Sequence, residues 1–209
     1  MKVFILSVLF SVMLAGCGQQ ANLPANNAVP PVAAESSPAT VPQADTAATA
    51  ADSIYTELVP AKCKERKPKP DSGAIIEAEC PGVGGYKVIF SASDHSQVLS
   101  MVDPTGKETL LSFRDALNTV ADFMLGDKIE WRTDGKGKDA KPSGIIVRVT
   151  KFTDPEDKSK SQSILAVARL TGEAPCITDL VSPSADQNTR ARQLADTKDR
   201  PCITAKIAR

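Results

Sequence analysis

The five cysteines are the residues of this sequence whose chemistry depends most clearly on their position. Cys17 directly follows residues 3–15, an apolar run interrupted only by Ser7 and Ser11. The run is shorter than the roughly 20 apolar residues of a bilayer-spanning helix, and it has the length of a signal-peptide hydrophobic region. An N-terminal core helix or a membrane anchor is the alternative. Cys17 therefore places a nucleophilic thiol at the end of a segment that directs export.

The four residues that end this segment, Leu14-Ala15-Gly16-Cys17, resemble the lipobox of bacterial lipoproteins. The resemblance implies that residues 1–16 are a lipoprotein signal peptide and that the Cys17 thiol takes a diacylglycerol before cleavage. It also implies acylation of the new amine, so the mature chain holds a membrane through two or three acyl chains. Each buried methylene contributes about 0.8 kcal/mol, which makes such an anchor durable. Gly18, where inner-membrane lipoproteins commonly carry Asp, implies the periplasmic, inner face of the outer membrane.

The next segment has the composition of a tether. Residues 18–52 are mostly Ala, Pro, Gln, Asn, Ser and Thr, without an aromatic residue and without Lys or Arg. Such a segment buries too little apolar surface to offset the entropy of ordering it. We therefore expect the lipidated Cys and a disordered Ala/Pro-rich tether over 17–52. A wall-threading segment or a docking motif is the alternative.

The remaining residues, 53–209, are long enough for one globular domain with one core. The chain carries 25 basic and 25 acidic residues, a balance that argues against a nucleic-acid partner.

Four further cysteines, Cys63, Cys80, Cys176 and Cys202, form an even set in a chain expected to be exported. Export favours disulfides, and four cysteines allow three connectivities. We expect Cys63–Cys80 and Cys176–Cys202, because each pair flanks a short unit with an antiparallel pattern. The absence of a CxxC motif argues against redox catalysis, and a single histidine with long cysteine spacings argues against zinc. We expect no metal and no cofactor.

Alternating apolar residues and turn signals predict an α+β domain, mainly antiparallel β, compact and stapled by disulfides. A short C-terminal helix is expected from about 183 to 198, with Ser182 as its N-cap and Pro183 in its first turn. Residues 109–125 fit either a helical stripe or a loop with one helical turn. The expected strands are 54–59, 74–80, 86–91, 98–102, 128–133, 144–152, 163–170 and 176–180.

Several short motifs together resemble a group of small exported proteins of Gram-negative bacteria whose function is uncharacterised. The motifs are Cys63, Cys80-Pro81-Gly82 with Gly85-Tyr86, Glu130-Trp131-Arg132, and the segment 185–196 before Cys202. The resemblance implies an exported, disulfide-bonded domain over most of 55–205, and it implies no activity.

Catalytic candidates are few. His95, the single histidine, lies beside Asp94 and near several serines, but a Ser-His-Asp hydrolase needs these groups to converge and the chain has no GxSxG motif. A histidine in a polar surface turn is the simpler interpretation. The Gly-rich stretch 82–85 lacks the GK[ST] ending of a phosphate loop, so it is expected to be a turn. No catalytic residue is therefore assigned.

Binding candidates come from a basic run and from the single tryptophan. Residues 62–69 carry five Lys or Arg against Glu65, and Lys64, Arg66 and Lys67 form the centre of the run. They suit an anionic envelope component or an acidic protein, and a solvated loop is the alternative. Trp131 is either a partner anchor or a core residue.

These features predict a membrane-anchored periplasmic lipoprotein that acts as a non-enzymatic binding or envelope-assembly module. The alternatives are a lysozyme-inhibitor-like protein or a periplasmic hydrolase.

Overall fold

The computed structural model describes residues 51–94, 96–119, 122–135, 140–154 and 156–204. The leader and the expected tether up to residue 50 lie outside the described residues, as does His95. Within the described residues, alternating sequence segments form ten strands in two five-stranded antiparallel sheets, which we call sheet A and sheet B.

Sheet A contains the two longest strands, and each strand pairs antiparallel with its neighbour. Its spatial order is β1 (Asp52–Glu57), β7 (Phe123–Asp134), β8 (Lys141–Phe152), β9 (Ser161–Arg169) and β10 (Cys176–Val181).

Sheet B is a meander in which chain order and spatial order coincide. Its strands are β2 (Lys64–Arg66), β3 (Ile76–Pro81), β4 (Lys87–Ala92), β5 (Gln97–Val102) and β6 (Glu108–Leu111). The chain enters sheet B through the 3-10 turn η1 (Pro60–Lys62) and returns to sheet A through α1 (Phe113–Leu117).

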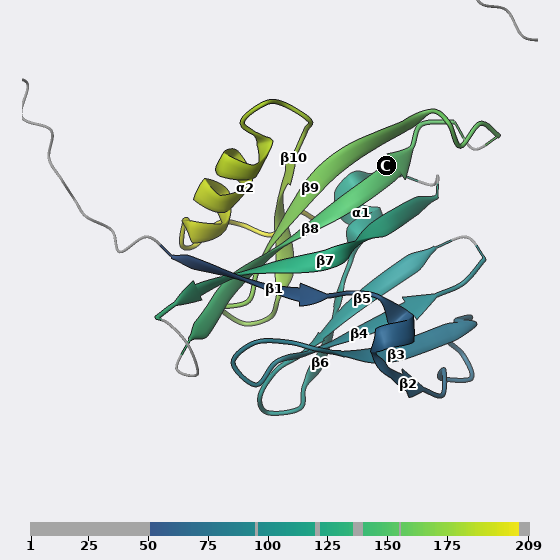
Figure 1. The fold of residues 1–209 in the computed structure, drawn as a ribbon, viewed down its shortest axis with the longest axis horizontal. Coiled ribbons are helices and arrows are strands. Elements are labelled where there is room, and N and C mark those ends of the chain that lie inside the picture. The colour runs from purple at the N-terminus through teal and green to yellow at the C-terminus, as the bar shows by residue number, and fades with distance from the viewer. Residues whose placement is uncertain (1–50, 95, 120–121, 136–139, 155, 205–209) are drawn as a thin grey trace, which may run out of the picture. The chain divides into compact units, whose positions relative to one another are not determined.

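The main core lies between the two sheets. Alternate residues of β8 and β9, such as Ile145, Val147 and Ala166, meet Val88 and Leu99 of sheet B there. The helix α2 (Gln187–Asp196) covers the opposite face of sheet A, as Figure 1 shows. A second, smaller apolar cluster fills that interface, and it consists of Ile146, Leu165, Val167, Val181 and Ala191. The layers are therefore sheet B, sheet A and α2, and β8 and β9 are buried on both faces.

The mainly antiparallel β architecture and the short C-terminal helix are confirmed, but several boundaries differ from expectation. Of the two interpretations of 109–125, the continuous helical stripe is wrong and the single helical turn is closer, because only Phe113–Leu117 is helical, between strands β6 and β7. Residues Lys64–Arg66 are a strand rather than a loop, because they pair with Glu77–Glu79 of β3.

The C-terminal helix begins at Gln187, later than expected, with Asp186 rather than Ser182 at the N-cap. Residues before it form a turn in which the Gln187 amide donates to the Ser184 carbonyl. The Gln187 side chain donates to the backbone carbonyls of Val181 (2.8 Å) and Ser163 (3.3 Å). These hydrogen bonds to sheet A fix the position of the first residue of the helix.

Both expected disulfides are present. Cys63–Cys80 joins the segment before β2 to β3, with 4.6 Å between the Cα atoms. Cys176–Cys202 joins the start of β10 to the segment after α2, with 5.7 Å between the Cα atoms. Each restricts the unfolded chain, which stabilises the native state by roughly 3 kcal/mol for loops of this size.

A buried charge network fastens α2 to sheet A. Glu130 and Arg132 alternate with Trp131 on β7 and point to the helix side. Arg192 Nε donates to Glu130 Oε1 at 2.6 Å, and Arg132 donates to both carboxylate oxygens of Asp196 at 2.8 Å. Burial raises the pKa of Glu130, but hydrogen bonds from Arg192, Ser53 and Tyr55 outweigh it, and the net pKa is lowered.

Replacing Glu130 tests this network. Glu130→Gln should reduce the free energy of unfolding by about 2 kcal/mol near neutral pH, because the half-exposed Arg192 loses its carboxylate and the buried Arg132 keeps only Asp196. The pKa of Glu130 is depressed in the folded state, so this contribution is present above the ordinary value of 4.5 and is lost as pH falls through the folded value. Urea unfolding of both proteins across that range measures the difference. Glu173→Gln, at an exposed position, is the control; equal effects of the two variants would contradict the network.

Candidate functional site

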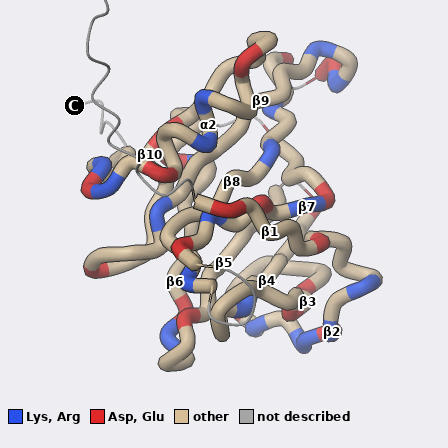
Figure 2. Tube along the Cα trace, turned by 60° about the vertical axis from the view of Figure 1, so that its left-hand side comes forward, with Lys and Arg blue, Asp and Glu red and all other residues tan. Residues whose placement is uncertain are grey.

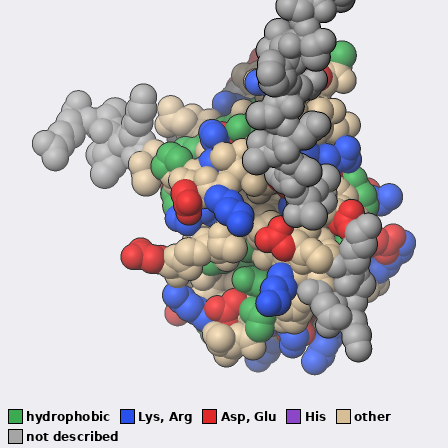
Figure 3. Space-filling view, turned by 90° about the vertical axis from the view of Figure 1, so that its left-hand side faces the viewer, with side chains coloured by type: hydrophobic (Ala, Val, Ile, Leu, Met, Phe, Trp, Pro, Cys, Tyr) green, Lys and Arg blue, Asp and Glu red, His purple; other side chains and the backbone are tan. Residues whose placement is uncertain are grey.

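Folding brings carboxylates to the basic run of residues 62–69. Lys62 pairs with Glu57 of β1 at 2.9 Å, Arg66 with Glu77 of β3 at 3.3 Å, and Lys69 with Glu108 of β6 at 3.3 Å. Basic and acidic residues consequently lie close together around β2 and β3 (Figure 2). The same mixture of signs covers the face of the molecule in Figure 3. The run is thus less basic in the fold than its composition indicates.

Lys64 and Lys67 keep exposed side chains and form no ion pair with another described residue. Lys64 lies on β2 opposite Glu79 of β3. Lys87 of β4 pairs with the same carboxylate, with 2.9 Å between Nζ and Oε1. Glu79 therefore pairs with Lys87 alone, and the nearby positive charge of Lys64 remains without an ion pair among the described residues.

Lys64, Glu79 and Lys87 border a shallow groove of about 490 Å³, which we call the basic groove. The Cys63–Cys80 disulfide and Tyr86 contribute apolar surface to it. Its charged lining consists of three lysines and one glutamate, which are Lys62, Lys64, Lys87 and Glu79.

The electrostatics of Glu79 reflect this excess of positive charge. The hydrogen bond from Lys87 lowers the pKa of Glu79, burial opposes this effect, and the charges of Lys87, Lys64 and Arg66 add to it. Glu79 is therefore ionised at neutral pH, and it offsets only one of the neighbouring cations. The groove can accept a further anionic group through charge-assisted hydrogen bonds.

Of the predicted binding residues, the structure brings Lys64 to the groove and places Arg66 beside Glu77. Sequence reasoning missed Lys87. The alternation of β4 indicates that Lys87 and Ile89 share a face, but only the strand register places Lys87 near Lys64.

Trp131 does not fit the role of an exposed partner anchor, because its side chain is fully buried between the sheets. Its indole Nε1 donates to Thr56 Oγ1 at 2.8 Å, and its ring lies 6.2 Å from that of Tyr86. The core interpretation of this residue therefore holds. The neighbouring Gly-rich stretch is the expected turn, in which Gly82 has no room for a Cβ because Tyr86 O would lie 2.4 Å away.

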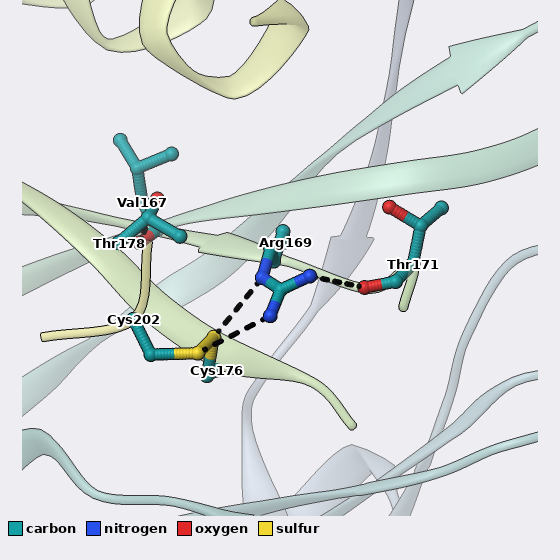
Figure 4. The surroundings of a disulfide bond; sticks show 6 residues. All are labelled: Val167, Arg169, Thr171, Cys176, Thr178 and Cys202. Carbon is teal, nitrogen blue, oxygen red and sulfur yellow. Dashed lines mark hydrogen bonds between the residues drawn. A yellow bond between two sulfur atoms is a disulfide. The ribbon is translucent and has the colours of Figure 1, made fainter. Parts of the chain in front are cut away.

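A larger cavity of about 580 Å³ lies near the end of α2, and Arg169 forms part of its wall. Figure 4 shows the Arg169 guanidinium directed at the Cys176–Cys202 disulfide. Its Nε lies 3.3 Å from Cys176 Sγ, and its Nη1 donates to the Thr171 carbonyl at 3.0 Å. These contacts hold Arg169 against the disulfide, so its role there is structural.

Residues 51–204, apart from the short gaps given above, contain no group of three or more His, Cys, Asp or Glu that could hold a metal ion. None of the described helices is long and apolar enough to cross a membrane. Cys17 lies outside the described residues, so its lipidation stays a prediction.

Removing Lys87 tests the electrostatics of the groove. Lys87→Met should raise the pKa of Glu79 toward 4.5, because the hydrogen bond from Lys87 is the largest cause of its depression. Lys64→Met should raise it less, since Lys64 acts only through its charge. Carboxyl-carbon NMR titration measures both shifts, and Lys107→Met, at an exposed turn position, serves as the control. A larger effect of Lys64→Met would contradict this geometry.

Comparison of the chain with models of protein families, with curated proteins and with solved structures finds no match.

Proposed function

We propose that this chain is a lipid-anchored, non-enzymatic binding module of the bacterial cell envelope, and that the basic groove of sheet B contacts an anionic partner. The observation that carries the proposal is the excess of lysine over glutamate in the groove, where exposed Lys64 forms no ion pair with any described residue. The leader residues Leu14–Cys17 supply the anchor in this account.

The charge arrangement supports an acidic surface on an envelope protein as the partner. A carboxylate that approaches Lys64 and Lys87 gains hydrogen bonds to ionised donors, which are shorter and stronger than neutral ones. The Cys63–Cys80 disulfide fixes the groove wall, so little ordering is needed on binding. Exposed charge pairs mainly accelerate association, and salt screens them, so binding should weaken as ionic strength rises.

The location follows from the leader and agrees with the disulfides. Two disulfides suit an oxidising compartment such as the periplasm. Gly18 favours the outer membrane, with the domain on its periplasmic side. A lysozyme-inhibitor-like role and a hydrolase role stay predictions, since no contact among the described residues favours either.

Replacing Cys17, the residue expected to carry the lipid, tests the membrane anchor. Cys17→Ser should abolish incorporation of a palmitate analogue during growth and move the protein out of the membrane fraction, because an alcohol does not replace the thiol. Gly16→Ala keeps a small residue before the cysteine and should retain both the label and the membrane location. Labelling of the Cys17→Ser protein at the level of the parent chain would exclude the lipoprotein assignment.

The groove is tested by charge reversal in the lipidated chain. In-cell crosslinking followed by mass spectrometry should recover one acidic envelope protein, and Lys64→Glu should lower its yield roughly five-fold, the effect of about 1 kcal/mol. Lys141→Glu changes the same charge at an exposed position in sheet A and should leave the yield unchanged. Arg66 is left intact because it pairs with Glu77. Equal yields from the two variants would remove the groove from the account, and recovery of lipid or wall fragments alone would exclude a protein partner.

A further inference from the structure

A third cavity lies on the outer face of sheet B, which is the face directed away from sheet A. Its volume is about 160 Å³, well above the roughly 10–15 Å³ that one water molecule needs. Five serines contribute to its wall, together with Glu77 and the Lys69–Glu108 ion pair. We call it the serine cavity.

The strand register explains why these groups share one face. Glu77, Ser91 and Val98 are direct partners across β3, β4 and β5, and Ser100 lies two residues after Val98 on β5. Their neighbours Phe90 and Leu99 enter the main core, so the row that contains Glu77 points the other way.

Residues 67–75 form the cover of the serine cavity. They leave β2 at one edge of sheet B, and Lys69 reaches Glu108 on β6, the opposite edge strand. The Ile75 amide then donates to the Ala92 carbonyl at 2.7 Å. The segment is therefore fastened above the sheet at two points, with Lys69, Ser72 and Ala74 facing the cavity.

Glu77 has unused acceptor capacity in this cavity. Its side chain is only 4% exposed, and its Oε1 accepts no hydrogen bond from the described residues. Arg66 Nε lies 3.3 Å from this oxygen and balances its charge, but without hydrogen-bond geometry. A buried carboxylate oxygen that accepts no hydrogen bond destabilises the fold, because it has lost its hydrogen bonds to water and gained none in return. Glu77 lines the cavity, and a ligand that donates a hydrogen bond to its carboxylate would offset this cost.

We propose that the serine cavity binds a neutral, hydroxyl-rich ligand of about the size of one sugar ring. A ligand hydroxyl donates to the Glu77 carboxylate, and the serine hydroxyls, which both donate and accept, bond the neighbouring hydroxyls. Charge favours a neutral ligand over an ion, because Arg66 offsets Glu77 and Lys69 offsets Glu108. The site is separate from the basic groove and does not depend on the partner proposed for it.

Titration of the full chain, labelled with ¹⁵N and purified in detergent, tests the proposal. The probes are D-glucose and N-acetylglucosamine as free sugars and chitotetraose as a glycan chain. We expect saturable shifts of the Ser91 and Ser100 amides. Binding of chitotetraose through one ring identifies a glycan end as the ligand source, and binding of the free sugars alone identifies a small solute.

Two variants connect those shifts to the cavity. Glu77→Gln should weaken binding about ten-fold, the effect of one hydrogen bond to a charged acceptor. Ser100→Ala leaves the Glu77–Arg66 pair intact. It should weaken ligand binding about five-fold, the effect of losing one neutral hydrogen bond. The matched control is Glu79→Gln, on the same face of β3 but in the wall of the basic groove; it should bind like the parent chain.

Three outcomes would overturn the proposal: an absence of saturable shifts with all three probes, equal loss in Glu79→Gln and Glu77→Gln, or tighter binding of methylammonium than of any sugar. The last would show that the cavity selects a cation.

Discussion

Burial of β8 and β9 on both faces is the constraint on which the rest of the structure depends. Ile145 and Val147 enter the main core, whereas Ile146 and Val167 point to the opposite side. If either face of sheet A were uncovered, its apolar side chains would contact water, which costs a free energy of about 25 cal/mol for each Å² of apolar surface. Sheet A therefore needs two covers, and the chain supplies sheet B on one side and α2 on the other (Figure 1).

The two covers are held by different forces. Sheet B contributes a broad apolar face, but α2 offers only a narrow one around Ala191, so charged groups complete its attachment. Glu130 and Arg132 are buried on β7 and each meets a partner from the helix, as buried charges require. Within the part of the chain that the structure describes, no second sheet covers the outer face of sheet B, where the serine cavity lies, and the basic groove lies at the edge of the same sheet. The layer order thus determines where polar sites are available.

The sequence predicts local structure better than it predicts the candidate site. Period-two alternation identifies most strands, including the one expected at 144–152, which the structure extends to Lys141–Phe152. Lys64–Arg66 is too short to carry a pattern, so its pairing with β3 is not visible before folding. The same register brings Glu77 to Arg66 and places Lys87 and Lys64 around one groove, although these residues lie on different strands. Such contacts depend on tertiary packing, and no local propensity encodes them.

The way in which the chain enters sheet A has a mechanical consequence. Arg132 donates to the carbonyl of Ala51 and to the hydroxyl of Ser53, on either side of the first residue of β1. All six residues of β1 pair with β7, from Asp52 opposite Thr133 to Glu57 opposite Lys128. A force that pulls the N-terminal end along the strand is therefore shared by the whole ladder and by this guanidinium. Resistance to such a pull depends on the rate of forced unfolding rather than on equilibrium stability. The fold thus places the full β1–β7 ladder and the Arg132 hydrogen bonds at the point where load from any attached tether would arrive.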